Sequence, residues 1–295
     1  MPAARLSAEE WAACVILTAG ARALDTIARL ETSKEEAVHD ARVALRRFRT
    51  STRALASTLQ TVVDPAMFDS AIDAARALAT ALGAVRDRDV EIAWLAESAR
   101  ESPADGDAIG RLIVDRQTDR GRSVAAIDPC AAVTAIASIQ SALTETNRPN
   151  TCTSLAPLAG RLARRSVRRL RRALDVAIDR ATLHRARVAG KRARYALEII
   201  AVAAPDVLDD DIRTLTALQD ALGAHNDATT GLLALARDIE RIALMPDRST
   251  DATALARLLL RREAQREESL AVARKLWNDV PRPRRLARRL MRELG

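Results

Sequence analysis

The sequence predicts an all-α protein made of antiparallel helices joined by short turns, and three observations support this fold class. Apolar residues recur with the helical period in one stretch after another, and no stretch shows the apolar–polar alternation typical of a strand. Aromatic residues make up 2% of the 295 residues, and a large β-sandwich or barrel would need many more. Residues that start and stop helices also recur along the chain, which favours helical bundles.

These start and stop signals define the expected helices in order. Ser7 and Ser33 each stand three residues before a glutamate, which is the spacing of a capping box. Asp64 precedes a proline, a pair that favours the first turn of a helix. Gly83 and Gly223 follow periodic apolar runs and are expected to end helices. The expected helices are 7–31, 33–60, 65–82, 85–101, 104–122, 129–146, 157–180, 183–203, 206–222, 225–244, 251–278 and 283–293.

The two halves of the chain repeat two motifs in the same order. The sequence HDARVALRRFR at 39–49 returns as HRARVAGKRAR at 184–194, 145 residues later. The sequence LGAVRD at 82–87 returns as LGAHND at 222–227, 140 residues later. Two matches at nearly the same offset predict a tandem duplication. We therefore expect two similar helical bundles that face each other, one formed by residues 1–148 and the other by residues 149–295.

Positive charge is concentrated in two stretches that contain few or no acids. The chain has 47 Lys and Arg against 39 Asp and Glu, a net charge of +8. Residues 161–194 contain 13 basic and 2 acidic residues, and residues 42–53 contain 5 arginines and no acid. A GC-rich genome would explain the high overall share of arginine, but it would not explain this clustering. Because evenly mixed charge is typical of a solvated surface, these two stretches are candidate polyanion-binding surfaces.

On a helix, the basic residues of each repeated motif lie on one face. In the first copy, His39 and four arginines follow one another at steps of three and four residues, and the opposite face is apolar. Stacked like charges cost roughly 0.2–0.5 kcal/mol per pair, so carboxylates of neighbouring helices or a bound polyanion must compensate them. The expected polyanion-binding residues are His39, Arg42, Arg46, Arg49, Arg53, Arg161, Arg165, Arg168, Arg172, His184, Arg187, Lys191 and Arg194.

Three aspartates follow the glycines of the second repeated motif. Asp87, Asp89 and Asp227 are expected to cap helices or to orient the basic residues, and a catalytic role is the weaker alternative. His39 and His184 begin the two basic faces and are expected to donate to an anion, with a structural role as the alternative. Neither histidine is followed by a second ligand at helical spacing, so we expect no metal and no cofactor. The role of the third histidine, at position 225, stays open.

Neither a signal peptide nor a membrane-spanning segment is expected. The N-terminus lacks a basic-then-apolar pattern, and the longest uncharged run, 129–144, is too short and too polar to span a bilayer. Cys14, Cys130 and Cys152 are odd in number and scattered, so neither a disulfide framework nor a zinc site is expected. The sequence predicts a reduced, cytoplasmic protein with no membrane partner.

Together, these motifs resemble those of the CHAD family, the conserved histidine α-helical domain. The resemblance rests on the paired motifs at 39–49 and 184–194, on Leu-Gly-x-x-Arg-Asp-x-Asp at 82–89 and on Leu-Gly-x-x-Asn-Asp at 222–227. It implies a single domain of two four-helix bundles related by pseudo-twofold symmetry. It also implies a basic central channel that binds inorganic polyphosphate through the basic residues named above, and in bacteria an association with polyphosphate granules. Further similar positions are Leu218-Gln219, Arg194-Tyr195 and Glu198.

Two other functions compete with polyphosphate binding without catalysis. The dipeptide His39-Asp40 is found in metal-dependent all-α phosphohydrolases, but those enzymes use a further histidine upstream, and His39 is the first histidine of this chain. A basic surface also attracts nucleic acid, but single-strand binders add aromatic platforms for the bases, and six dispersed aromatic residues offer none. We therefore expect no enzyme and no specific nucleic-acid partner.

Overall fold

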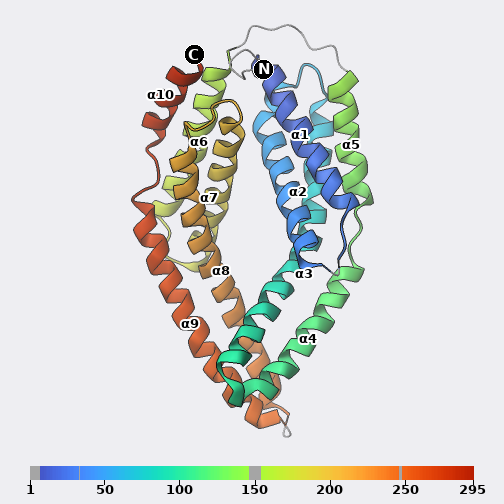
Figure 1. The fold of residues 1–295 in the computed structure, drawn as a ribbon, viewed down its shortest axis with the longest axis vertical. Coiled ribbons are helices and arrows are strands. Elements are labelled where there is room, and N and C mark those ends of the chain that lie inside the picture. Colours follow the sequence, from blue (N-terminus) through green and yellow to red (C-terminus); the bar gives the residue numbers. More distant parts are fainter. Residues whose placement is uncertain (1–6, 33, 146–153, 246–247) are drawn as a thin grey trace.

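The computed structural model describes residues 7–32, 34–145, 154–245 and 248–295, and most of the described chain is helical (Figure 1). No strand occurs among these residues, which confirms the predicted all-α class. Ser33, Cys152 and the expected boundary after residue 148 lie outside the described residues. The elements are α1 (Ala8–Ala28), α2 (Glu35–Leu55), η2 (Ala56–Thr58), α3 (Pro65–Glu101), η3 (Pro103–Asp105), α4 (Gly106–Ala125), α5 (Cys130–Glu145), α6 (Leu155–Asp175), α7 (Arg180–Ala201), α8 (Asp209–Ala243), α9 (Ser249–Trp277) and α10 (Pro283–Leu294).

Two groups of helices form the wide end of the molecule, and two helical hairpins form its narrow end (Figure 1). One group contains α1, α2, α5 and the first part of α3, and the other contains α6, α7, α10 and the first part of α8. At the narrow end α3 packs on α4, α8 packs on α9, and α4 meets α9. We call this narrow end the tip. Helices α2 and α7, which contain the two copies of the first motif, contact each other between the groups. A pseudo-twofold relation between the two halves remains a prediction.

The predicted helix ends at Gly83 and Gly223 are wrong. Both glycines lie inside continuous helices, because α3 runs for 37 residues and α8 for 35. A glycine inside a helix costs only about 1 kcal/mol relative to alanine, and α3 and α8 pack against neighbours on both sides of these positions. The capping role predicted for Asp87, Asp89 and Asp227 is therefore also wrong, because all three lie in helix interiors.

Helix starts agree better with the sequence. Ser7 and Glu10 form the predicted capping box of α1, with Ser7 Oγ accepting from the Glu10 N–H at 3.1 Å. Asp64 Oδ1 accepts from the Ala66 N–H at 2.9 Å and begins α3 just before a proline. Asp179 forms a further capping box at the start of α7, a residue that the sequence analysis did not single out. These local signals hold because the capping residue and its partner are three residues apart or fewer.

The apolar faces of the helices form two separate cores. The larger core fills both groups of helices at the wide end and includes Trp11, Phe48 and Leu170. The smaller core fills the tip and includes Leu112 and Leu255. Because burying one such side chain contributes about 2 kcal/mol, these cores fix the helices in place. The basic faces of α2, α6 and α7 lie outside both.

Helix α1 is long and apolar enough to cross a bilayer by length and composition, and the bent pair of helices at 103–125 and 130–145 would pass the same test as a single span. Trp11, Ile16 and Ala23 of α1 are buried in the larger core. There α1 packs on α2 and α5. This burial accounts for part of its apolar sequence.

Candidate functional site

A cavity of about 660 Å³ lies between the two halves of the molecule. Its walls come from α2, α3, α7 and α8, and α9 contributes one residue. We call it the central cavity. Six of the predicted anion-binding residues line it, three from each copy of the repeated motif: His39, Arg42, Arg46, His184, Arg187 and Lys191.

Helices α2 and α7 hold these side chains in place by packing their opposite faces into the core. On α2, Leu45 and Phe48 are fully buried, whereas Arg42 and Arg46 line the central cavity. Across the contact between the two helices, the Arg46 guanidinium donates to the Tyr195 hydroxyl at 3.2 Å. The Arg47 guanidinium donates to the Glu198 carboxylate at 3.3 Å. The two basic faces are therefore fixed next to each other, although the motifs lie 145 residues apart.

Positive charges crowd the central cavity and change one another's pKa. Burial, followed by the charges of Arg46, Arg187 and Arg42, lowers the pKa of Lys191 from 10.5 to about 7. Burial also lowers the pKa of Arg42 and of Arg187, and a neighbouring arginine acts in the same direction on each. Near neutral pH, Lys191 is thus protonated in only part of the molecules. An anion in the cavity would favour its charged form.

Two of the three predicted aspartates face this basic cluster. Asp227 Oδ1 lies 3.9 Å from Arg187 Nη2. Burial raises the pKa of Asp87, with Asp227 acting in the same direction and Arg42 and Arg187 in the opposite one. Asp89 was expected to orient the basic motif residues, and this is wrong. Its buried carboxylate pairs with Arg120 of α4 instead, because it faces α4 rather than α2 or α7.

The three histidines differ in their surroundings. His39 and His184 are exposed residues that line the central cavity, and His184 Nδ1 lies 3.3 Å from Asn226 Oδ1. His225 is buried, and its Nδ1–H donates to the carbonyl of Arg266 at 3.0 Å. This bond joins α8 to α9, so the open question about His225 resolves to a structural role.

Beyond the central cavity, further arginines of α2 and α7 extend the basic surface toward α6. Burial is the largest cause that lowers the pKa of Arg49. The positive charges of four neighbours lower it further: Arg53, Arg76, Arg46 and Arg192. Burial is likewise the largest cause that lowers the pKa of Arg192, and the positive charges of Arg53 and Arg169 lower it further. Each of these cations lies within electrostatic range of the next, so positive charge extends without a break from α2 and α7 to α6.

Four predicted residues line a second depression rather than the central cavity. This groove, of about 880 Å³, lies between α6, the start of α1 and the end of α2, and Glu9 is its one acidic lining residue among those described. We call it the α6 groove. Arg194 lines neither site, because its guanidinium pairs with Glu198 at 3.5 Å and lies over the Tyr195 ring. The predicted residues in the α6 groove are Arg161, Arg165, Arg168 and Arg172.

Comparison with known families agrees with the resemblance seen in the motifs. The model of the CHAD domain family matches residues 18–236. The chain belongs to the CHAD domain family. It shares its fold with the CHAD domain from the plant Ricinus communis, at 21% identity and a TM-score of 0.64 over 93% of each chain. It is also similar to PptA from Streptomyces chartreusis, at 17% identity and a TM-score of 0.68 over 92% of this chain and 99% of that one. No curated protein matches the sequence.

One cavity residue of this CHAD protein was missed by sequence reasoning. Arg262 of α9 lies beyond the family match, yet it lines the central cavity. It is 7% exposed, and its guanidinium lies 4.1 Å from the centroid of the Trp94 ring. A Cβ at Gly231 would lie 2.7 Å from Arg262 Nε, so this glycine makes room for the arginine. A lone glycine inside the predicted helix 225–244 is the only signal that the sequence offered.

Proposed function

We propose that this CHAD protein binds inorganic polyphosphate in the central cavity and along the arginines that lead from it to the α6 groove, without hydrolysing it. One observation supports this most strongly: cations from two distant motifs converge where few carboxylates compensate them. The central cavity is lined by seven arginine or lysine residues and four aspartate or glutamate residues. Within the described residues, neither Arg42, Arg46 nor Lys191 forms an ion pair with a carboxylate.

Unpaired donors point to the same ligand chemistry. The Nε atoms of Arg49 and Arg187 are buried and have no hydrogen-bond partner among the described residues. Arginines outside the proposed site, such as Arg289, also have such atoms, so these donors add to the charge argument and do not identify the ligand by themselves. A phosphate oxygen is a suitable acceptor, because a guanidinium donates to two such oxygens at once.

The linear order of the basic residues favours a chain of phosphates over a single compact anion. The cations run from the central cavity through Arg49, Arg53, Arg192 and Arg169 into the α6 groove. A polyphosphate chain presents one charge after another along the same path. Binding would neutralise these charges and release counterions from the chain, so its affinity is expected to fall with salt.

Nucleic acid is the closest competing ligand class, and the lining residues disfavour it. None of the residues that line the central cavity or the α6 groove is Phe, Tyr or Trp, whereas binders of single strands stack the bases on such rings. In the cell, a polyphosphate-binding protein of this kind would reside in the cytoplasm at polyphosphate granules. That placement is part of the proposal.

The test is a calorimetric titration with long-chain polyphosphate at near-physiological salt. The triple variant Arg42→Gln/Arg46→Gln/Arg187→Gln should lose at least ~100-fold in affinity, since a hydrogen bond to a charged group contributes about 1.5 kcal/mol or more. The matched control removes three exposed arginines outside these sites, Arg100, Arg122 and Arg213. Equal losses in the two variants would mean nonspecific charge attraction. Phosphate release from polyphosphate by the wild-type protein, abolished in Asp40→Asn, would contradict binding without hydrolysis.

A further inference from the structure

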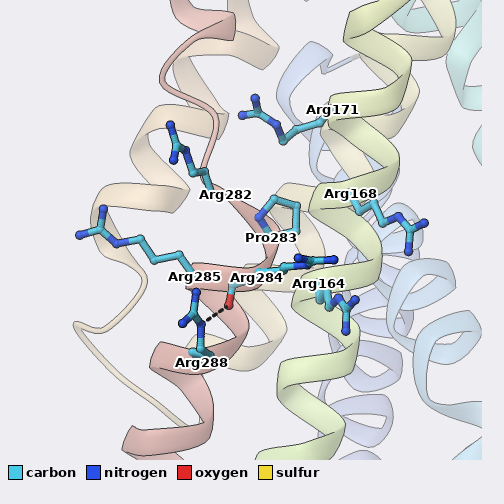
Figure 2. A pocket seen from close by; sticks show the side chains of 8 residues that line it. All are labelled: Arg164, Arg168, Arg171, Arg282, Pro283, Arg284, Arg285 and Arg288. Carbon is cyan, nitrogen blue, oxygen red and sulfur yellow. Dashed lines mark hydrogen bonds between the residues drawn. The ribbon is translucent and has the colours of Figure 1, made fainter.

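A further cleft is lined by arginines, and none of its lining residues lines the central cavity. It has a volume of about 780 Å³ and is bounded by α6 and the start of α10 (Figure 2). Seven of its eight lining residues are arginines and the eighth is Pro283. The arginines of this α6–α10 cleft are Arg164, Arg168, Arg171, Arg282, Arg284, Arg285 and Arg288.

The arginines of the α6–α10 cleft lack carboxylate partners, whereas a neighbouring arginine on α10 has one. Within the described residues, none of the seven forms an ion pair with a carboxylate. Arg171 donates to the Val280 carbonyl at 2.7 Å, which fixes the segment before α10. Arg289 directly follows the cleft residue Arg288 on α10, and it pairs with Asp211 of α8. Helix α10 thus uses one arginine to hold its position and leaves those facing the cleft uncompensated.

Helix α10 packs closely on α6 beside the cleft. Leu286 and Leu290 of α10 are buried in the larger core. A Cβ at Gly160 of α6 would lie 3.4 Å from the Met291 side chain and 3.5 Å from the Ala287 carbonyl. This close approach fixes the backbones of the two helices relative to each other, so the two sets of arginines extend from a common frame.

The start of α10 is electrostatically unfavourable without an anion. Its first turn contains no acidic residue and no side-chain cap. The positive end of the helix dipole repels arginines in the first turn. The arginines of α6, across the cleft, repel them as well. An anion in the cleft would relieve both effects.

We propose that the α6–α10 cleft is a second binding site for phosphate chains, and that a long polyphosphate chain reaches it from the α6 groove. Arg164 and Arg168 line both the cleft and the α6 groove, so the two sites share a wall. Helix α10 lies beyond the residues that the family model matches. This inference rests on the proposed function, and it adds a prediction that long chains bind more tightly than chains that fill the central cavity alone.

The test compares two variants, each missing three arginines, in titrations with tripolyphosphate and with long-chain polyphosphate. In the cleft variant, Arg284, Arg285 and Arg288 become glutamine, a good helix former. This variant should lose at least tenfold in affinity for the long chain, and the slope of log affinity against log salt should flatten by about 2, as expected for three lost phosphate contacts. Its affinity for tripolyphosphate in the central cavity should stay within about threefold of wild type, since tripolyphosphate is too short to join the sites.

The second variant is the control at Arg100, Arg122 and Arg213, which should bind both ligands as wild type does. Equal long-chain affinity in the cleft variant and this control would overturn the second site, whereas loss of binding on changing Arg42, Arg46 and Arg187 would still support the proposed function. A cleft variant that keeps its long-chain affinity for polyphosphate but loses affinity for single-stranded DNA would also overturn the inference. Circular dichroism confirms that α10 remains folded in each variant.

Discussion

The arginines of the tip and those of the central cavity are the same residue type in opposite surroundings. At the tip, five arginines have a carboxylate partner on another helix or in the segment joining two helices, and a sixth, Arg248, pairs with Asp251 in the first turn of α9; several of these carboxylates are buried. In the central cavity, arginines outnumber carboxylates, and burial lowers the pKa of Arg42 and of Arg187. The tip pairs are Arg111–Asp251, Arg116–Glu91, Arg116–Asp238, Arg241–Asp115, Arg248–Asp251, Arg257–Asp105 and Arg261–Glu101.

The supply of carboxylates, and not the number of arginines, separates the two regions. A buried arginine with acidic partners holds helices together, and removing it leaves those acids unpaired. An arginine without partners adds little to the fold and is available to a ligand. The same substitution should therefore lower stability at the tip and lower affinity at the central cavity.

The largest expected effect on stability is at Arg116. Its side chain is 7% exposed and bridges Glu91 and Asp238. Changing Arg116 to glutamine should lower the free energy of unfolding by about 3 kcal/mol, because two largely buried carboxylates lose their partner. Urea denaturation measures this loss. The control Arg122→Gln removes an arginine from an exposed pair with Asp119 and should change stability little. An equal loss of unfolding free energy in the two variants would contradict the claim that the paired, buried arginines of the tip stabilise the fold.

The next effect concerns pH and the central cavity. Lys191 has a pKa of about 7 in the free protein, and a bound polyanion should raise that pKa. The complex then holds more protons than the free protein, so polyphosphate affinity is full below pH 7 and falls by up to about tenfold per pH unit between 7 and 9. The charged groups that shift the pKa of Lys191 are Arg42, Arg46, Arg187 and Asp227.

Lys191→Arg is the matched control for this pH effect, because arginine stays charged across the whole range. Titrations of long-chain polyphosphate at pH 6, 7, 8 and 9 compare the two proteins. The account predicts a steep decline above pH 7 for wild type and a nearly flat profile between pH 7 and 9 for the variant. Parallel profiles would show that Lys191 does not couple protons to binding.

The smallest effect compares two glycines in long helices. A Cβ at Gly83 would lie 3.6 Å from Arg42 Nη2, an ordinary contact, whereas a Cβ at Gly231 would lie 2.7 Å from Arg262 Nε. Gly83→Ala should therefore raise the free energy of unfolding by about 0.5–1 kcal/mol. Gly231→Ala should gain less or lose stability, because the guanidinium must move. Thermal denaturation of both variants decides between these outcomes, and an equal gain at both positions would contradict the close approach.

The sequence predicted what depends on near neighbours. Ser7 and Asp64 cap helices as expected, since a cap involves residues only two or three apart. The family resemblance implied a central channel that both motifs line, and residues of 39–49 and 184–194 do line one cavity. The helix breaks at Gly83 and Gly223 were wrong because local signals cannot register the packing that keeps α3 and α8 continuous.

Contacts between helices distant in sequence stayed beyond prediction. Asp89 pairs with Arg120 of α4, and nothing in either segment identifies this partner before the helices are packed. Arg262 enters the central cavity from α9 and lies over the Trp94 ring, outside any repeated motif. The composition showed an excess of arginine, but only the packed helices show which arginines have acidic partners.

The most direct measurement compares polyphosphate affinity in two variants that each lose three arginines. One variant changes Arg42, Arg46 and Arg187 of the central cavity to glutamine, and the other changes Arg111, Arg257 and Arg261 of the tip. Both are titrated by calorimetry at a temperature at which circular dichroism shows them folded. The account predicts a loss of at least ~100-fold for the first and affinity within about threefold of wild type for the second. Equal losses would contradict the claim that the weakly compensated arginines of the central cavity form the binding site.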